Sequence, residues 1–139
     1  MNTRSISKTS LNILQLLLQI NFNVSVIFVL VVSLMSLAGS DIFFENNSDL
    51  YGPLANNLRM VLLYLCFVQL AVYGFYQMHS NYAAVFTLGA FLLILIVSLQ
   101  FYSIINQIEI DPSYQQIFLY VGLSHVLYGG ICVLRKNNG

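Results

Sequence analysis

The stretch from Tyr82 to Ile105 reads YAAVFTLGAFLLILIVSLQFYSII and contains no Asp, Glu, Lys or Arg. A helix needs about 20 mostly apolar residues to cross the roughly 30 Å of hydrocarbon in a bilayer. An open strand cannot satisfy its backbone hydrogen bonds in lipid. A barrel strand would alternate apolar and polar residues over about 10 positions, whereas this run is continuous. The stretch therefore predicts a transmembrane α-helix.

Three further segments have the same character. We expect spans at about residues 20–38, 58–78, 82–105 and 114–134, which make residues 1–139 a single transmembrane domain. Of the 139 residues, 58% are hydrophobic and only 7% are charged, whereas a soluble domain carries roughly 25% charged residues. This composition excludes an ordinary soluble enzyme. The predicted fold class is all-α, an integral membrane four-helix bundle. Because the formal net charge is zero, we expect no nucleic-acid partner.

The charged residues separate along the chain. Basic residues flank the first and last spans, and acidic residues lie in the loops after spans one and three (Arg4, Lys8, Arg135, Lys136; Asp41, Glu45, Asp49, Glu109, Asp111). Four crossings put both termini on one side of the membrane, and the positive-inside rule assigns that side to the cytoplasm. Arg59, at the outer end of the second span, is the exception. We expect it to snorkel to the interface or to pair with a loop acid.

A polar stripe precedes the most apolar part of the first span. Asn12, Gln15, Gln19 and Asn23 recur at spacings of three and four residues, which places them on one face of a helix. The stripe has two interpretations. It belongs either to a lead-in helix that lies partly among the lipid headgroups, or to a longer span whose polar face packs on a partner. We favour the first.

No Asp, Glu, Lys or Arg lies in the core of a predicted span, which argues against a self-sufficient ion-coupled transporter. His125 is the histidine near the middle of a span. Gly122 and Gly129 lie at i−3 and i+4 from His125 and share its helical face. Because glycines allow helices to approach closely, we interpret His125 as a packing and hydrogen-bonding residue rather than a haem ligand or a proton relay. Gln100 and Ser103 form a polar stripe on the third span, which we interpret as cross-helix hydrogen bonding rather than a substrate path.

The sequence offers no pattern for catalysis or for a metal. Cys66 and Cys132 lie in apolar runs without a CxxC partner or a nearby His, so we interpret them as small buried residues and expect neither a disulfide nor a metal site. No nucleophile–base pair, glycine-rich phosphate loop or ligand cluster occurs. We therefore predict no catalytic residue and no directly bound cofactor.

Three segments follow one another in a recognisable order: GPLANNLRMVLL at 52–63, LQFY at 99–102, and FLY at 118–120 followed by HVLYGG at 125–130. They resemble three successive helices of subunit III of the haem–copper (cytochrome c) oxidases. In that family the first helix opens with Pro-Leu-x-Asn-Thr, which Asn56 matches and Asn57 does not. The last carries Phe-aromatic and then His-Gly-Leu-His-Val-x-x-Gly, which His125 matches at the second His.

The chain also departs from that family. Gly122 stands at the first His of the family motif, and Ser25 and Val26 stand where the family has a Ser-Glu pair. Any role of that acidic residue in proton uptake is therefore not carried over. The family commonly has five or seven spans, so this chain would lack the first two and the last.

The resemblance implies a non-catalytic accessory subunit of a respiratory terminal oxidase, which supports assembly, lipid binding and stability of the catalytic subunit. Haem and copper are then expected in the partner subunits I and II. Membrane lipids are further partners, and the location is the bacterial cytoplasmic (inner) or the mitochondrial inner membrane. The expected packing, lipid or partner interface comprises Gly122, His125, Gly129, Gln100, Ser103, Asn56 and Arg59.

Two other functions fit the same pattern. The chain could be an accessory subunit of another multi-subunit membrane complex. It could also be a small four-span transporter that works as a homo-oligomer. Four spans alone enclose little protected volume, so each of these functions requires partners or self-assembly.

Overall fold

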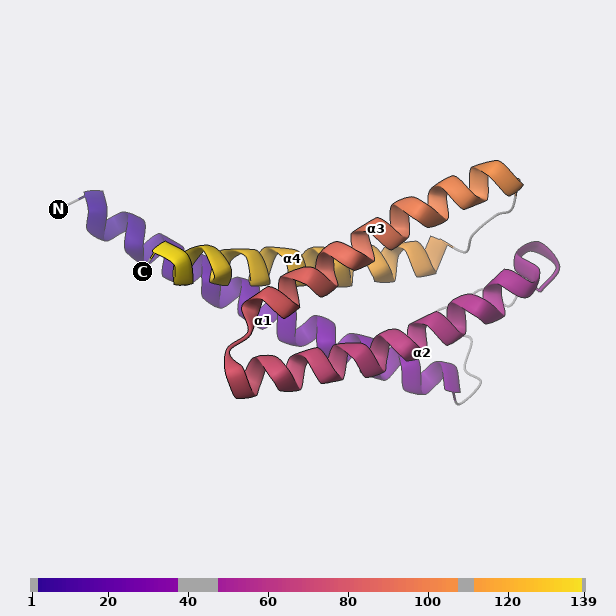
Figure 1. The fold of residues 1–139 in the computed structure, drawn as a ribbon, viewed down its shortest axis with the longest axis horizontal. Coiled ribbons are helices and arrows are strands. Elements are labelled where there is room, and N and C mark those ends of the chain that lie inside the picture. The colour runs from indigo at the N-terminus through magenta and orange to yellow at the C-terminus, as the bar shows by residue number, and fades with distance from the viewer. Residues whose placement is uncertain (1–2, 38–47, 108–111, 139) are drawn as a thin grey trace.

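The computed structural model describes the backbone of residues 3–37, 48–107 and 112–138, and the side chains of residues 7–35, 60–107 and 115–138. These residues form the helices α1 (Thr3–Leu37), α2 (Ser48–His79), α3 (Tyr82–Asn106) and α4 (Pro112–Asn138), with no strand in the described part of the chain (Figure 1). Each helix contains a segment long and apolar enough to cross a membrane. The predicted all-α fold with four potential membrane spans is thus confirmed.

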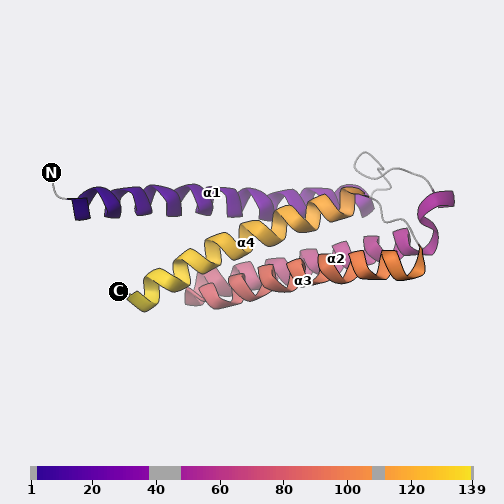
Figure 2. The same cartoon turned by 90° about the horizontal axis from the view of Figure 1, so that it is seen from above.

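Helix α1 is longer than the sequence predicted. It is one unbroken helix of 35 residues, with an apolar segment from Ser7 to Met35, whereas we expected a first span at about 20–38. No Pro or Gly interrupts it. At 1.5 Å per residue the helix is about 52 Å long, well over the roughly 30 Å of bilayer hydrocarbon. Its N-terminal end projects beyond the other helices (Figure 2).

A short turn joins α2 to α3 and makes them antiparallel neighbours there. Ser80 takes a left-handed conformation (φ 52°), and its N–H donates to the carbonyl of Tyr76 at 2.9 Å. The Asn81 side chain then caps α3 by accepting from the N–H of Ala84 at 3.2 Å. Beyond the turn the two helices diverge, because α3 packs on α4 while α2 runs near α1 (Figure 1).

Helix α4 is the centre of the bundle. Half of its most apolar window is buried, against 33% for α1 and 22% for α2 and for α3. Its most extensive contact is with α3, followed by that with α1. The N- and C-terminal ends of the chain lie at the same end of the bundle (Figure 1).

Two apolar clusters fill the interior. One surrounds Leu62, Leu92 and Phe118, and the other joins Phe22 to Val85 and Tyr128. Cys66 and Cys132 are buried and free, which confirms their interpretation as buried residues. Many large apolar side chains face outward instead, as expected of helices that are surrounded by lipid or by other helices.

Candidate functional site

Glycines bring α3 and α4 into backbone contact. A Cβ on Gly89 would lie 2.6 Å from the backbone nitrogen of Val126, and a Cβ on Gly129 would lie 2.6 Å from that of Phe86. A Cβ on Gly122 would meet the Leu93 side chain at 3.0 Å. The structure therefore places Gly122 and Gly129 at this contact. Because glycine has no side chain, the two helices can approach closely there. Gly89, which completes it from α3, was not predicted.

His125 lies on the same helix but directs its ring towards α1 and α2. It is 1% exposed, and the Phe22 ring of α1 stands edge-on to it at a centroid distance of 4.9 Å. Its Nδ1 is 2.8 Å from the carbonyl oxygen of Val121, one turn earlier. Its Nε2 is 3.5 Å from the Nε2 of Gln69 on α2. The imidazole thus contacts three helices, including its own.

These two contacts determine the tautomer of His125. A carbonyl oxygen only accepts, so Nδ1 carries the hydrogen and donates to Val121. An amide nitrogen only donates, so Nε2 accepts from Gln69. In this arrangement the imidazole is neutral, and both of its nitrogens are used within the chain. A metal could reach Nε2 only by displacing Gln69.

A second set of polar contacts joins α1 to the C-terminal end of α4. The guanidinium of Arg135 donates to the side-chain oxygens of Gln15 and Asn12, the latter at 2.8 Å. The Gln15 amide nitrogen lies 3.5 Å from the sulfur of Cys132. Asn12 and Gln15 therefore fit the second interpretation of the polar stripe, a longer span whose polar face packs on a partner, whereas a position among the lipid headgroups stays a prediction. They belong to a long continuous helix and bind another helix of the bundle.

Asn21 continues this α1–α4 contact deeper in the bundle. Its amide nitrogen donates to the Ser124 hydroxyl at 2.9 Å, and its oxygen accepts from the Tyr120 hydroxyl at 3.1 Å. The Ser124 hydroxyl in turn donates to the Tyr120 carbonyl at 2.7 Å. Both ends of the amide are thus hydrogen-bonded, which fixes the register between the two helices.

Aromatic side chains close the space between α1, α2 and α4. Phe22, fully buried, contacts the rings of Tyr73, Tyr76 and Tyr128 at centroid distances of 5.9, 5.8 and 4.9 Å. The hydroxyls of Tyr76 and Tyr128 share a hydrogen bond of 2.6 Å. These tyrosines therefore satisfy each other's polar ends while their rings pack in the interior.

The other predicted interface residues lie elsewhere. Gln100 is exposed on α3 and has no hydrogen bond to another described helix. Ser103, half-buried on α3, accepts the Gln107 N–H at its backbone carbonyl, which caps the helix end. Asn56 and Arg59 belong to α2, and their side chains lie outside the described residues. Of the predicted interface residues, Gly122 and Gly129 thus share the α3–α4 contact, whereas the His125 ring faces α1 and α2 from the same helix.

Several central residues were not predicted as interface residues. Gln69 and Asn21 are amides in apolar surroundings, and a buried amide is costly unless it is hydrogen-bonded. This cost indicates that each amide needs a hydrogen-bond partner in the bundle, and it was the signal by which both residues could have been predicted. Nothing local indicated their partners, because His125 is 56 positions from Gln69 and Ser124 is 103 from Asn21.

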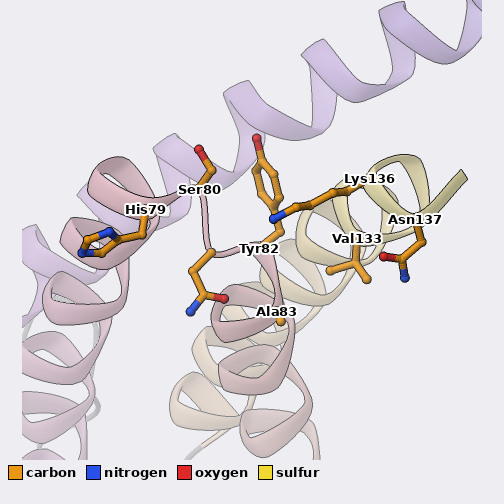
Figure 3. Close-up of a pocket in the computed structure, with 8 residues that line it drawn as sticks. His79, Ser80, Tyr82, Ala83, Val133, Lys136 and Asn137 are labelled. Carbon is orange, nitrogen blue, oxygen red and sulfur yellow. The ribbon is translucent and has the colours of Figure 1, made fainter. Parts of the chain in front are cut away.

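Two cavities flank the C-terminal end of α4. One, of about 310 Å³, lies beside the α2–α3 turn, and Figure 3 shows Lys136 extending from α4 towards Tyr82 there. The other, of about 540 Å³, lies between α1 and α4 and is lined by Lys8, Leu11, Asn12, Ile131, Leu134, Arg135 and Asn138. Both therefore lie near helix ends and not midway along the bundle.

The described residues contain no group of three or more His, Cys, Asp or Glu that could hold a metal ion. No protein-family model matches the chain, and no curated protein or solved structure matches it. The resemblance to oxidase subunit III therefore stays a prediction.

Proposed function

We propose that this chain is a non-catalytic accessory subunit of a multi-subunit membrane complex, and that the complex is a respiratory terminal oxidase. One observation carries the proposal. Among the described side chains, every buried polar atom except the Ser33 hydroxyl has a hydrogen-bond partner in the chain. The buried polar groups thus hold the helices of this chain together, as expected of a structural component.

A transport path makes a different demand on the same residues. Polar groups along such a path must face water or exchange partners with the transported solute. Here the Gln69 amide, the His125 ring and the Asn21 amide bind neighbouring helices instead. Polar contacts between membrane helices contribute on average about 0.6 kcal/mol each. Together they fix how α1, α2 and α4 sit against one another.

The outer surface of α1 supports a partner helix. We define the outer α1 seam as a series of exposed apolar residues spaced alternately by three and four positions: Leu17, Ile20, Val24, Ile27, Val31 and Leu34. This is the spacing at which helices pack side by side over several turns. In the proposal, a transmembrane helix of a partner subunit covers this seam.

The oxidase form of the proposal is supported by the sequence resemblance. Its clearest motif, around His125 and Gly129, lies on α4, which is the most buried helix of the bundle. Haem and copper would belong to the partner subunits I and II, as in the family. By the positive-inside rule both termini face the cytoplasm of a bacterium or the equivalent mitochondrial matrix.

The test is to purify the tagged chain from its native membrane in mild detergent and to record a reduced-minus-oxidised spectrum. An a-type haem signal supports the oxidase proposal. A haem-free assembly with other subunits would still support the accessory role, but it would refute the proposal that the complex is a terminal oxidase. A haem-free homo-oligomer would refute both and favour a small transporter.

A further inference from the structure

We propose that the cavity between α1 and α4 binds an acidic segment of a partner subunit, whose carboxylates meet Lys8 and Arg135 and whose apolar side chains cover the leucines beside them. We call this cavity, whose volume is about 540 Å³, the α1–α4 groove. The inference rests on the accessory role and deepens it, because it names the chemistry of the partner at one place on this chain. The groove is a different surface from the outer α1 seam.

The first argument is the charge of the groove. Lys8 contributes a cation from α1 and Arg135 contributes one from α4, and both residues are exposed. The side chains described for residues 7–35, 60–107 and 115–138 include no Asp or Glu, so none of them neutralises the two cations. An anionic occupant would therefore stabilise them.

The sequence positions of the chain's own acidic residues argue against this chain, or a second copy of it, as the source of the anion. All five occur where α1 ends and α2 begins, or where α3 ends and α4 begins (Asp41, Glu45, Asp49, Glu109, Asp111). Those helix ends lie at the opposite end of the bundle from the two chain ends (Figure 1). A second copy with the same orientation in the membrane would have the same arrangement. The carboxylates therefore belong to a different polypeptide.

The position of Lys8 favours a protein segment over a lipid headgroup. Helix α1 is about 52 Å long and the hydrocarbon of a bilayer is roughly 30 Å thick, so α1 exceeds the hydrocarbon by about 22 Å. The headgroup layer of one leaflet accounts for only about 5–8 Å of this excess. The N-terminal part of α1 projects beyond the other helices (Figure 2), and Lys8 belongs to its second turn. With the far end of α1 at the opposite hydrocarbon boundary, Lys8 therefore lies on the water side of the lipid phosphates.

Arg135 and the apolar residues of the groove define what the partner segment carries. Bonds to Gln15 and Asn12 hold the guanidinium against α1 and use two of its five N–H donors. The remaining donors suit the two oxygens of a carboxylate. Leu11 and Leu134 line the groove beside the cations and are 39% and 63% exposed. A carboxylate flanked by apolar side chains fits both parts of the groove, whereas a free inorganic anion would leave the leucines uncovered.

The two lysines of the chain provide the experiment and its matched control. Lys8 lines the α1–α4 groove, and Lys136 lines the cavity beside the α2–α3 turn at the same end of the bundle. The tagged chain is purified with its partners from the native membrane in mild detergent. A water-soluble carbodiimide is then added, which joins a lysine amine to a carboxylate in contact with it through an amide bond. We expect mass spectrometry to find Lys8, and not Lys136, joined to an Asp or Glu of another polypeptide.

Two variants of Lys8 separate the contact from its charge. Lys8→Arg keeps the charge but removes the reactive amine, so the cross-link should disappear while the partner is retained. Lys8→Glu should lower the amount of that partner retained per chain roughly fivefold, because it places like charges opposite each other, whereas Lys136→Glu should lower it less than about twofold. Size-exclusion profiles establish that each variant is folded.

Four results would overturn the inference: a cross-link from Lys8 to a lipid such as phosphatidylserine, a cross-link from Lys8 to a second copy of this chain, no cross-link from Lys8 although other polypeptides co-purify, or equal losses of the partner with Lys8→Glu and Lys136→Glu. As long as other polypeptides co-purify, each of these results leaves the accessory role intact. A purified particle that contains no other polypeptide would instead refute the accessory role, and the inference with it.

Discussion

At the scale of single residues, His125 and Gln69 form a polar pair in the interior, where each is 1% exposed. Each satisfies the other, and the pair joins α2 to α4 beside the Phe22 ring. Removing one partner leaves a buried polar group unsatisfied, whereas removing both does not.

His125→Leu should therefore lower the free energy of unfolding by about 1–3 kcal/mol, because the Gln69 amide loses its acceptor. The double variant His125→Leu/Gln69→Leu should recover part of this loss. Thermal unfolding in detergent measures both. In a purified oxidase complex, haem content per catalytic subunit should not change with His125→Leu. Loss of a haem signal in that variant would mean that His125 is a ligand.

Gly129 and Gly130 form a second residue-scale test, because they are adjacent and differ in available space. A Cβ on Gly129 would lie 2.6 Å from the Phe86 backbone, whereas a Cβ on Gly130 would meet only the Phe86 ring, at 3.5 Å. Gly129→Ala should destabilise the bundle by about 1–3 kcal/mol, and Gly130→Ala should be neutral or slightly stabilising. Equal melting temperatures for the two variants would contradict the close α3–α4 contact.

At the scale of elements, hydropathy alone predicted the four helices, since long apolar runs leave few other structures in lipid. The start of α1 was predicted less well. The polar stripe lowers hydropathy before residue 20, although the helix continues through it. Asn12 and Gln15 find their partner Arg135 more than 100 positions away. Such contacts depend on how whole helices pack, so the local spacing of residues in the sequence does not predict them.

The continuity of α1 is testable with proline. Gln19→Pro should cost about 3 kcal/mol or more, because proline in a helix interior removes a hydrogen bond and clashes with the preceding turn. Gln19→Ala is the control and should have little effect. Circular dichroism during thermal unfolding measures both. Equal stability of the two variants would show a natural break between a lead-in helix and the span.

At the scale of the whole molecule, the two chain ends lie together at one end of the bundle (Figure 1). The turn between α2 and α3 lies towards the same end. Described basic side chains gather there, and Lys8, Arg135 and Lys136 line its two cavities. This distribution is typical of the cytoplasmic end of a membrane protein.

Cysteine labelling tests this orientation. Cys66 and Cys132 are buried, so a single introduced cysteine should dominate the signal. Ser7→Cys and Asn137→Cys should react with an impermeant maleimide only after the cells are opened, whereas Gln107→Cys should react in intact cells. Labelling of Ser7→Cys and Asn137→Cys from opposite sides of the membrane would refute the four-span arrangement.

The most direct test of the accessory role is the polypeptide composition of the particle that contains this chain. The tagged protein is isolated from its native membrane in mild detergent, and every co-purifying chain is identified by mass spectrometry. We predict oxidase subunits I and II in constant ratio to this chain, and their loss in the Ile20→Ala/Ile27→Ala variant of the outer α1 seam. The matched pair Ile94→Ala/Val97→Ala on the exposed face of α3 should retain them. Recovery of this chain alone, or only with copies of itself, would contradict the account.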